Sequence, residues 1–282
     1  MIYRDFVKQF IPPILITSLR GLPIFPKPRF VWEGIYAHRR DVPTQNNSYD
    51  DAVEVRKQYD WTRAGLDLVN AGKLADLRHE LLAVVAAIAT ARAGAVSILD
   101  FGGAVGSGYV QLMATLPMNA AIQYCVVDLP NMCAAGRGLF AGDPRITFQT
   151  RLPTLDDRLD EDRLDIVYAS SVLQYIDDYC ELLQQLASAR AAFILLGQLA
   201  AGDIPTFATK QMNLGKKIMA YWFLNRDEVV GAFAAAGYKL VYEGLSDLEY
   251  DQSNFPETHR IGRMRNLLFR RSQSPGNPPM RS

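Results

Sequence analysis

Short apolar runs alternate with helical stretches from Val96 onward, a pattern typical of consecutive βαβ units. The runs predict seven strands, at Val96–Asp100, Tyr124–Asp128, Ile146–Gln149, Ile166–Ala169, Ala192–Gln198, Lys239–Gly244 and Asn266–Arg270. Helices are expected between the first five strands, and the stretch after the fifth is expected to be irregular. A further helix should begin at Asn225, in a capping-box arrangement with Glu228, and end at Gly237. We therefore predict an α/β fold.

The residues before this pattern are organised differently. Pro12–Pro13 separates two short apolar pieces, and residues 23–47 are rich in proline and aromatic side chains, as in an ordered arm. Apolar positions at helical spacing predict helices over Tyr49–Leu68, capped by Ser48, and over Lys73–Arg92, stopped by Gly94. We predict an N-terminal arm and mainly helical cap over residues 1–94, a larger domain over 95–271 and a polar, disordered tail over 272–282.

Composition narrows the function classes. The 282 residues are 49% hydrophobic and 21% charged, which is typical of a globular protein, and 30 basic side chains balance 30 acidic ones. With no basic run either, nucleic-acid binding is not expected. Three cysteines and three histidines lack metal-ligand spacing, so we expect no metal site and a reducing, cytoplasmic location. The apolar, basic N-terminal pieces are candidates for peripheral membrane contact or a dimer arm, although packing on their own domain is favoured.

The most informative segment is Asp100-Phe-Gly-Gly-Ala-Val-Gly-Ser-Gly-Tyr109. It takes an apolar strand through a glycine-rich turn into a helix, so the backbone at Gly102, Gly103 and Gly106 can approach a ligand closely. Asp128 ends the next strand, 22 residues beyond Gly106. A carboxylate in that place can accept hydrogen bonds from both hydroxyls of a ribose.

The residues that are missing indicate which nucleotide is bound. Ala104 and Ser107 stand where a dinucleotide-binding fingerprint needs glycine, and no phosphate-binding Gly-Lys-Ser/Thr follows. Asp100, directly before the glycines, suits a cationic ligand group such as the ammonium and sulfonium of S-adenosylmethionine. A tight βα turn without a ligand and a nicotinamide dehydrogenase are the weaker alternatives.

On these residues the chain resembles class I S-adenosylmethionine-dependent methyltransferases over about residues 95–271. With Ser170-Ser-Val-Leu-Gln-Tyr175 it resembles, more narrowly, methyltransferases encoded among bacterial surface-polysaccharide genes. The resemblance implies a Rossmann-like, seven-stranded, mostly parallel sheet with helices on both faces and a late antiparallel strand pair. It implies cofactor contacts from Asp100, Gly102, Gly103, Gly106, Asp128, Leu129 and Ser170. Ala104 replaces a glycine of many relatives, which puts the local backbone path in question.

The acceptor side carries less evidence. Strand ends line the ligand crevice of such sheets, so Gln174 and Tyr175 are expected to face the acceptor. The family commonly binds acceptors with the segment after the fifth strand, which points to Gln211, Tyr221 and Trp222, although these side chains also suit packing under a lid. We expect His259 to be the general base, with Asp177 as an alternative and Tyr175 as a further catalytic group.

The resulting hypothesis is methyl transfer from S-adenosylmethionine to a hydroxyl oxygen of a sugar. The genomic setting of the relatives implies a small-molecule or lipid-linked saccharide, in a cell-surface glycan or its precursor. The alternative from another class is a non-catalytic binding module on a degenerate methyltransferase fold.

Overall fold

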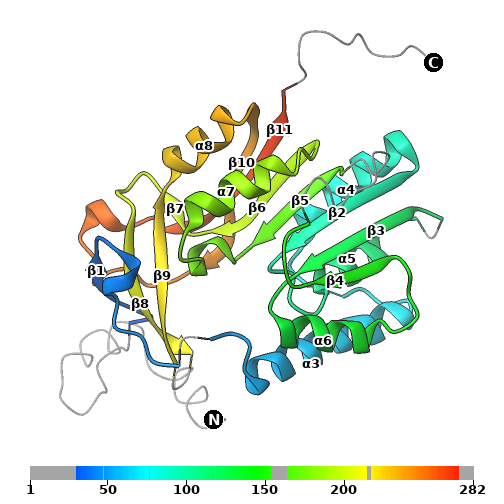
Figure 1. Ribbon diagram of the computed structural model, residues 1–282, viewed down its shortest axis with the longest axis horizontal. Coiled ribbons are helices and arrows are strands. Elements are labelled where there is room, and N and C mark those ends of the chain that lie inside the picture. Colours follow the sequence, from blue (N-terminus) through cyan, green and yellow to red (C-terminus); the bar gives the residue numbers. More distant parts are fainter. Residues whose placement is uncertain are drawn as a thin grey trace, which may run out of the picture.

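The computed structural model describes residues 30–272, except 47, 76, 118, 154–163 and 215–216. The predicted N-terminal pieces before residue 30 and the tail from residue 273 lie outside the described residues. The larger of its two main sheets has seven strands in the order β10-β11-β6-β5-β2-β3-β4 (Figure 1). Their bounds are β2 (Ala95–Phe101), β3 (Ala121–Val127), β4 (Ile146–Gln149), β5 (Ile166–Ser170), β6 (Phe193–Leu199), β10 (Tyr238–Glu249) and β11 (Arg263–Arg271).

This sheet confirms the predicted fold class and all seven predicted strands. β2 to β6 run parallel, and β11 lies antiparallel between β6 and β10. Alternate residues of each strand enter opposite core clusters, Ile98 with the helices of one face and Leu99 with those of the other. One face is covered by α4 (Glu80–Ala93), α5 (Ser107–Thr115) and α6 (Pro130–Leu139), and the other by α7 (Tyr179–Ser188) and α8 (Arg226–Ala235).

The helix ends agree with the sequence in part. Asn225 caps α8, since its side chain accepts hydrogen bonds from the amides of Asp227 and Glu228. Gly94 ends α4 at a φ of 70°. The first predicted helix, α3 (Ala52–Asn70), packs against α5 and α6. Its cap is Asp51 rather than Ser48, because the Asp51 carboxylate accepts from the amides of Val53 and Glu54. α4 begins seven residues later than predicted.

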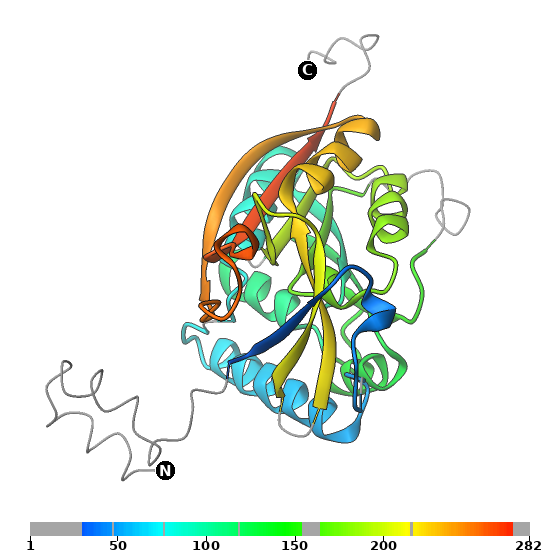
Figure 2. The ribbon, with the colours of Figure 1, turned by 90° about the vertical axis from the view of Figure 1, so that its left-hand side faces the viewer.

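A second sheet of four strands was not predicted. Its order is β1-β8-β9-β7, with β1 (Trp32–Tyr36), β7 (Ala201–Gly202), β8 (Phe207–Leu214) and β9 (Lys217–Asn225). The expectation of an irregular stretch after the fifth strand was therefore wrong. β7 and most described residues of β8 and β9 are buried, so these strands lack the alternation of buried and exposed positions that marks a half-buried strand, whereas β1 is mostly exposed. Figure 2 shows β1 beside the β8–β9 hairpin, in front of the large sheet.

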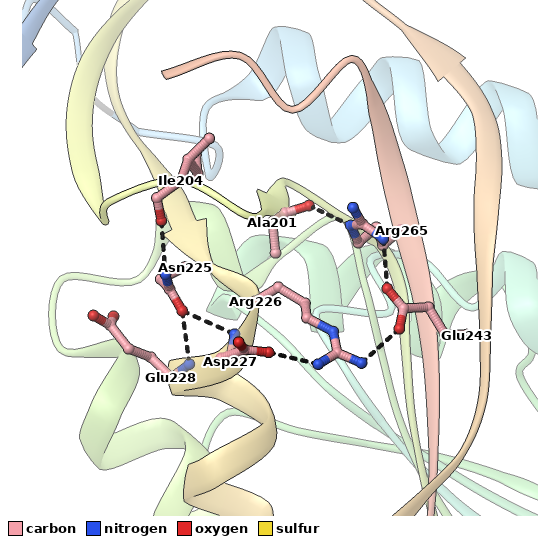
Figure 3. A network of polar contacts seen from close by, with 8 residues as sticks. All are labelled: Ala201, Ile204, Asn225, Arg226, Asp227, Glu228, Glu243 and Arg265. Atoms are coloured by element: carbon pink, nitrogen blue, oxygen red, sulfur yellow. Dashed lines mark hydrogen bonds and ion pairs between the residues drawn. The ribbon is translucent and has the colours of Figure 1, made fainter. Parts of the chain in front are cut away.

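A polar network joins the two sheets at the start of α8 (Figure 3). The Arg265 guanidinium of β11 donates to the carbonyl oxygen of Ala201 in β7, at 3.1 Å, and pairs with Glu243 of β10. Glu243 also accepts from Arg226, the first residue of α8, at 2.7 Å. The network fixes the small sheet against the edge of the large one.

Three short 3-10 helices complete the description: η1 (Arg39–Asp41), η3 (Leu173–Tyr175) and η4 (Glu257–His259). Among the described residues, no helix combines the length and apolarity needed to cross a membrane. The same residues contain no cluster of three or more side chains that could hold a metal ion.

Candidate cofactor and acceptor site

The glycine turn lies between β2 and α5, at the carboxyl edge of the large sheet. Gly102 and Gly106 have φ angles of 75° and 95°, in the left-handed region that favours glycine. A Cβ on Gly102 would lie 2.5 Å from the side chain of Val172, and one on Gly103 would lie 2.2 Å from the Asp100 carboxylate. The turn therefore has no room for side chains at these two positions.

Ala104 follows the path that glycine would take, at a φ of 48°. Its N–H donates to one carboxylate oxygen of Asp128 at 2.7 Å, and the N–H of Leu129 donates to the other at 2.6 Å. Burial raises the pKa of Asp128 above its ordinary value, and these two amides act in the opposite direction. Since a carboxylate can accept about four hydrogen bonds, Asp128 keeps capacity for a ligand's hydroxyls.

Asp100 lies beneath the turn. Its side chain is buried, and one of its oxygens accepts a hydrogen bond from the Tyr124 hydroxyl at 2.6 Å. Burial raises the pKa of Asp100 to about 7. Asp100 does not line the neighbouring cavity, so its predicted approach to a cofactor ammonium stays a prediction.

A cavity of about 500 Å³ lies over the carboxyl-terminal halves of β5 and β6, on the side of α4. Ser170, expected at the cofactor, lies in its wall. Nine of the other fifteen lining residues carry hydrogen-bonding side chains, and five of these come from β6, β10 and β11: Gln198, Ser246, Asp247, Glu249 and Asn266. Such a cavity suits a polar ligand with several hydroxyl groups.

His79, at the start of α4, links this cavity to the glycine turn. Its ring nitrogens lie 2.8 Å from the Tyr168 hydroxyl and 2.9 Å from the hydroxyl of Ser107, the residue after Gly106. Burial lowers the pKa of His79 to about 4, so the ring is neutral near pH 7. His79 precedes the first predicted strand of the large sheet and was therefore not considered. A helix leading into a strand across a tight turn runs antiparallel to it, which brings the helix start to the carboxyl edge.

Comparison with known proteins identifies the family. The family model for a methyltransferase domain matches residues 71–243, more than half of the chain. The chain belongs to this methyltransferase family. The predicted enzyme class and the predicted kind of fold are thereby confirmed.

Solved structures similar to this methyltransferase share only low sequence identity with it. One is an S-adenosylmethionine-dependent methyltransferase from Mesorhizobium loti, with 18% identity and a TM-score of 0.43, over 63% of this chain and 92% of that one. Another is magnesium protoporphyrin IX methyltransferase from Synechocystis PCC 6803 with bound SAH, with 16% identity and a TM-score of 0.43, over 79% and 88%. No curated protein matches the chain.

The structure does not bring the three predicted catalytic residues, His259, Asp177 and Tyr175, to the cavity of this methyltransferase. His259 lies in η4, hydrogen-bonded to the Thr258 hydroxyl at 3.0 Å and packed against Phe207 of the small sheet, with ring centroids 5.0 Å apart. Asp177 is 92% exposed and pairs with Arg39 at 2.6 Å, beside a second, more open cavity. Contacts between residues far apart in the sequence hold two of these away from the cavity: the small sheet holds His259, and Arg39 holds Asp177.

The predicted acceptor residues come together, but as packing between η3 and the small sheet. Gln174 and Tyr221 are almost fully buried, and the Trp222 indole donates to a backbone carbonyl oxygen of the loop after η3, at 3.1 Å. Gln211 is buried in β8, and burial raises the pKa of Tyr175 to about 12. The Gln174 amide donates to the carbonyl oxygen of a cavity-lining residue, Gln198, at 3.3 Å, so these side chains support the cavity wall from behind.

Proposed function

We propose that this methyltransferase transfers the methyl group of S-adenosylmethionine to a hydroxyl oxygen of a saccharide. The acceptor would be a cell-surface glycan or its small-molecule or lipid-linked precursor, reached in the cytoplasm or at the inner face of a membrane. The observation that carries this proposal is the polar cavity that His79 links to the residue after the glycine turn. Its hydroxyl, amide and carboxylate groups from several strands suit the hydroxyls of a sugar ring, which need donors and acceptors on several sides.

The residues at the turn fit the cofactor. Gly102 and Gly103 keep the backbone free of side chains, and Asp128 has capacity to accept from the ribose hydroxyls. The cofactor supplies a methyl group activated by the sulfonium. The protein contributes position and orientation, which is worth several kcal/mol in such reactions.

His79 is the group best placed to receive the acceptor's proton. A neutral imidazole carries one ring proton, so one nitrogen donates and the other accepts. The Tyr168 hydroxyl, which lines the cavity, connects His79 to the space where an acceptor hydroxyl would bind. The Tyr168 hydroxyl can take up the acceptor's proton and pass its own proton to Nδ1 of His79, provided that Nδ1 is the unprotonated nitrogen.

Titration calorimetry tests the cofactor half of the proposal. We expect S-adenosylmethionine and its demethylated product to bind and NAD not to bind. Asp128→Ala should weaken both by about tenfold to a hundredfold, since a hydrogen bond to a charged group contributes about 1.5–3 kcal/mol. Asp60→Ala, which removes an exposed carboxylate paired with Arg56 on α3, is the control and should bind normally. Binding of NAD alone would favour a dehydrogenase.

A screen with methyl-labelled cofactor tests the acceptor half. Sugar nucleotides and lipid-linked saccharides should become labelled in the presence of the wild-type protein, and Asp128→Ala should label them less. Cofactor binding without labelling of any saccharide pool would favour the non-catalytic binding module.

A further inference from the structure

The segment Ser48–Asp51 joins the small sheet to α3 and lies at the same edge of the large sheet as the glycine turn. Two of its side chains contact different parts of that edge. The Tyr49 ring packs edge-on against Tyr175, with centroids 4.9 Å apart, just beyond the end of β5. The Asp50 carboxylate accepts from the amides of Asn131 and Met132, at 3.0 and 3.3 Å, just beyond the end of β3.

The strand order shows what lies between these two contacts. β2 is the neighbour of both β5 and β3, and β2 leads directly into the glycine turn. A segment that is attached beyond β5 and beyond β3 must therefore pass the end of β2. The charge of Asp50 also contributes, after burial, to the raised pKa of Asp128, as expected for two neighbouring carboxylates.

The small sheet holds this segment through Lys217, the first residue of β9. Its ammonium donates to the carbonyl oxygen of Ser48 at 2.9 Å, pairs with the Asp51 carboxylate and lies 5.5 Å from the centre of the Tyr49 ring. The Lys217 side chain is only 15% exposed, so these interactions are partly shielded from water. A backbone bridge between Gln45 and Ile218 ties the preceding residues to the same strand.

We propose that Ser48–Asp51 forms a wall of the cofactor site that retains a bound S-adenosyl nucleoside, and that Lys217 is a positioning residue acting through this wall. The inference rests on the proposed cofactor. Lys217 itself touches the wall and not the ligand. Loosening the wall should therefore speed the escape of the ligand more than it slows its entry.

The test measures binding of S-adenosylhomocysteine, the demethylated product, by calorimetry and its release by stopped-flow displacement. Lys217→Met keeps the apolar stem and removes the charge, and Asp51→Asn removes the partner's charge while leaving a residue that caps α3. Each should raise the dissociation rate and Kd about tenfold. The double variant should resemble Lys217→Met, because that substitution already removes the ion pair that Asp51→Asn breaks.

Controls separate this role from a general loss of stability. Lys217→Arg should restore slow release, and Lys57→Met, which removes another lysine–carboxylate pair near the start of α3, should not change it. In hydrogen exchange of the wild-type chain, the amides around residues 48–51 should become protected when S-adenosylhomocysteine is added.

The outcomes distinguish the two proposals. Wild-type release rates in Lys217→Met and Asp51→Asn, or unchanged exchange at residues 48–51 on saturation, would overturn the wall while leaving the cofactor assignment intact. A wild-type protein that binds neither S-adenosyl compound would overturn both.

Discussion

The glycine-turn half of the site and the acceptor half are built in different ways. On the cofactor side, Asp100, the three glycines, Asp128 and Leu129 lie within 30 consecutive residues, and two parallel strands bring them together. On the acceptor side, the cavity wall combines the start of α4, the ends of β5, β6 and β10, and Asn266 near the start of β11. The small sheet behind it pairs β1 with β8, where hydrogen bonds span 176 residues. Local geometry therefore determines the first half, and long-range packing determines the second.

The largest effect on cofactor binding is expected at Gly103, in the crowded glycine turn of the cofactor side. Gly103→Ala would place a Cβ 2.2 Å from the buried carboxylate of Asp100, so the turn must shift. We expect cofactor affinity to fall at least a hundredfold, and the free energy of unfolding to fall by about 1–3 kcal/mol, as for other overpacked sites. Calorimetry and urea denaturation measure the two quantities.

A glycine elsewhere in the same domain provides the matched control. A Cβ on Gly138, inside α6, would meet no atom within 4 Å. Gly138→Ala should keep normal affinity and gain about 0.5–1 kcal/mol of stability from helix propensity. Normal cofactor binding by Gly103→Ala would mean that the turn is not a binding element.

The next largest effect, on turnover, distinguishes His79, the base suggested by the structure, from His259, the base predicted from the sequence. His79→Gln should lower turnover about a hundredfold or more with the acceptor found in the labelling screen, because it removes the proposed proton acceptor. His259→Gln should have a small effect, and the exposed His38→Gln none. The wild-type rate should stay level from pH 8 to pH 5.5 and fall toward the pKa of His79, about 4. A loss of turnover in His259→Gln as large as that expected for His79→Gln would restore His259 as the base.

A third prediction concerns the contribution of Asp100 to the stability of the folded protein. The pKa of Asp100 in the folded protein is about 7, above its ordinary value, so the folded chain holds a proton that the unfolded chain releases. The associated stability is fully present below about pH 4 and is lost as the pH rises through 7, by about 1.4 kcal/mol per unit of pKa elevation.

Asp100→Asn checks this sign. The variant keeps an oxygen that can accept from Tyr124 and removes the ionisation, so its stability should change less over this range. The free energy of unfolding of the variant should exceed that of the wild type by the largest amount near pH 8, as measured by urea denaturation at several pH values. If the two proteins lose stability in parallel between pH 4 and 8, Asp100 is not protonated in the folded state.

The smallest effect comes from Ala104, a residue with a side chain in a left-handed conformation. Glycine adopts this conformation without the steric cost of about 1–2 kcal/mol that Cβ imposes, though it is more flexible when unfolded. Ala104→Gly should therefore gain about 0.5–1 kcal/mol, with cofactor affinity changed less than twofold. A loss of stability would show that the alanine methyl makes packing contacts that outweigh the strain.

The outcome for individual residues shows why the sequence predicted one half better than the other. Most strands of the large sheet are short apolar runs bounded by a turn, so the predicted bounds fall within three residues of those observed, except that β10 continues five residues past its predicted end. Asn225 was correctly predicted as a cap because its partners are two and three residues away. For α3 the predicted cap Ser48 was wrong, because the helix begins three residues later than predicted and the Asp51 carboxylate accepts from its first amides.

The errors share a physical cause. Leu74 and Leu77 fit one helical stripe, yet Leu74 is 92% exposed and Leu77 is 2% exposed, because the chain between α3 and α4 is not helical. Thr209 and Gln211 are polar residues buried inside β8, where no local pattern marks a strand. Their partners are in β1, near the other end of the chain, so only the folded protein shows the pairing.

The pairing of β1 with β8 also has a consequence for synthesis of the protein. At about 5–20 residues per second, a ribosome makes Thr209 roughly 9 to 35 seconds after Glu33, its partner across the sheet. During that time the Trp32 strand has left the exit tunnel without a partner strand, while the local βαβ units have what they need to fold. The nascent chain thus carries an open strand through most of its translation. Pairing with a neighbouring nascent chain or capture by a chaperone would act during this interval, before the small sheet closes.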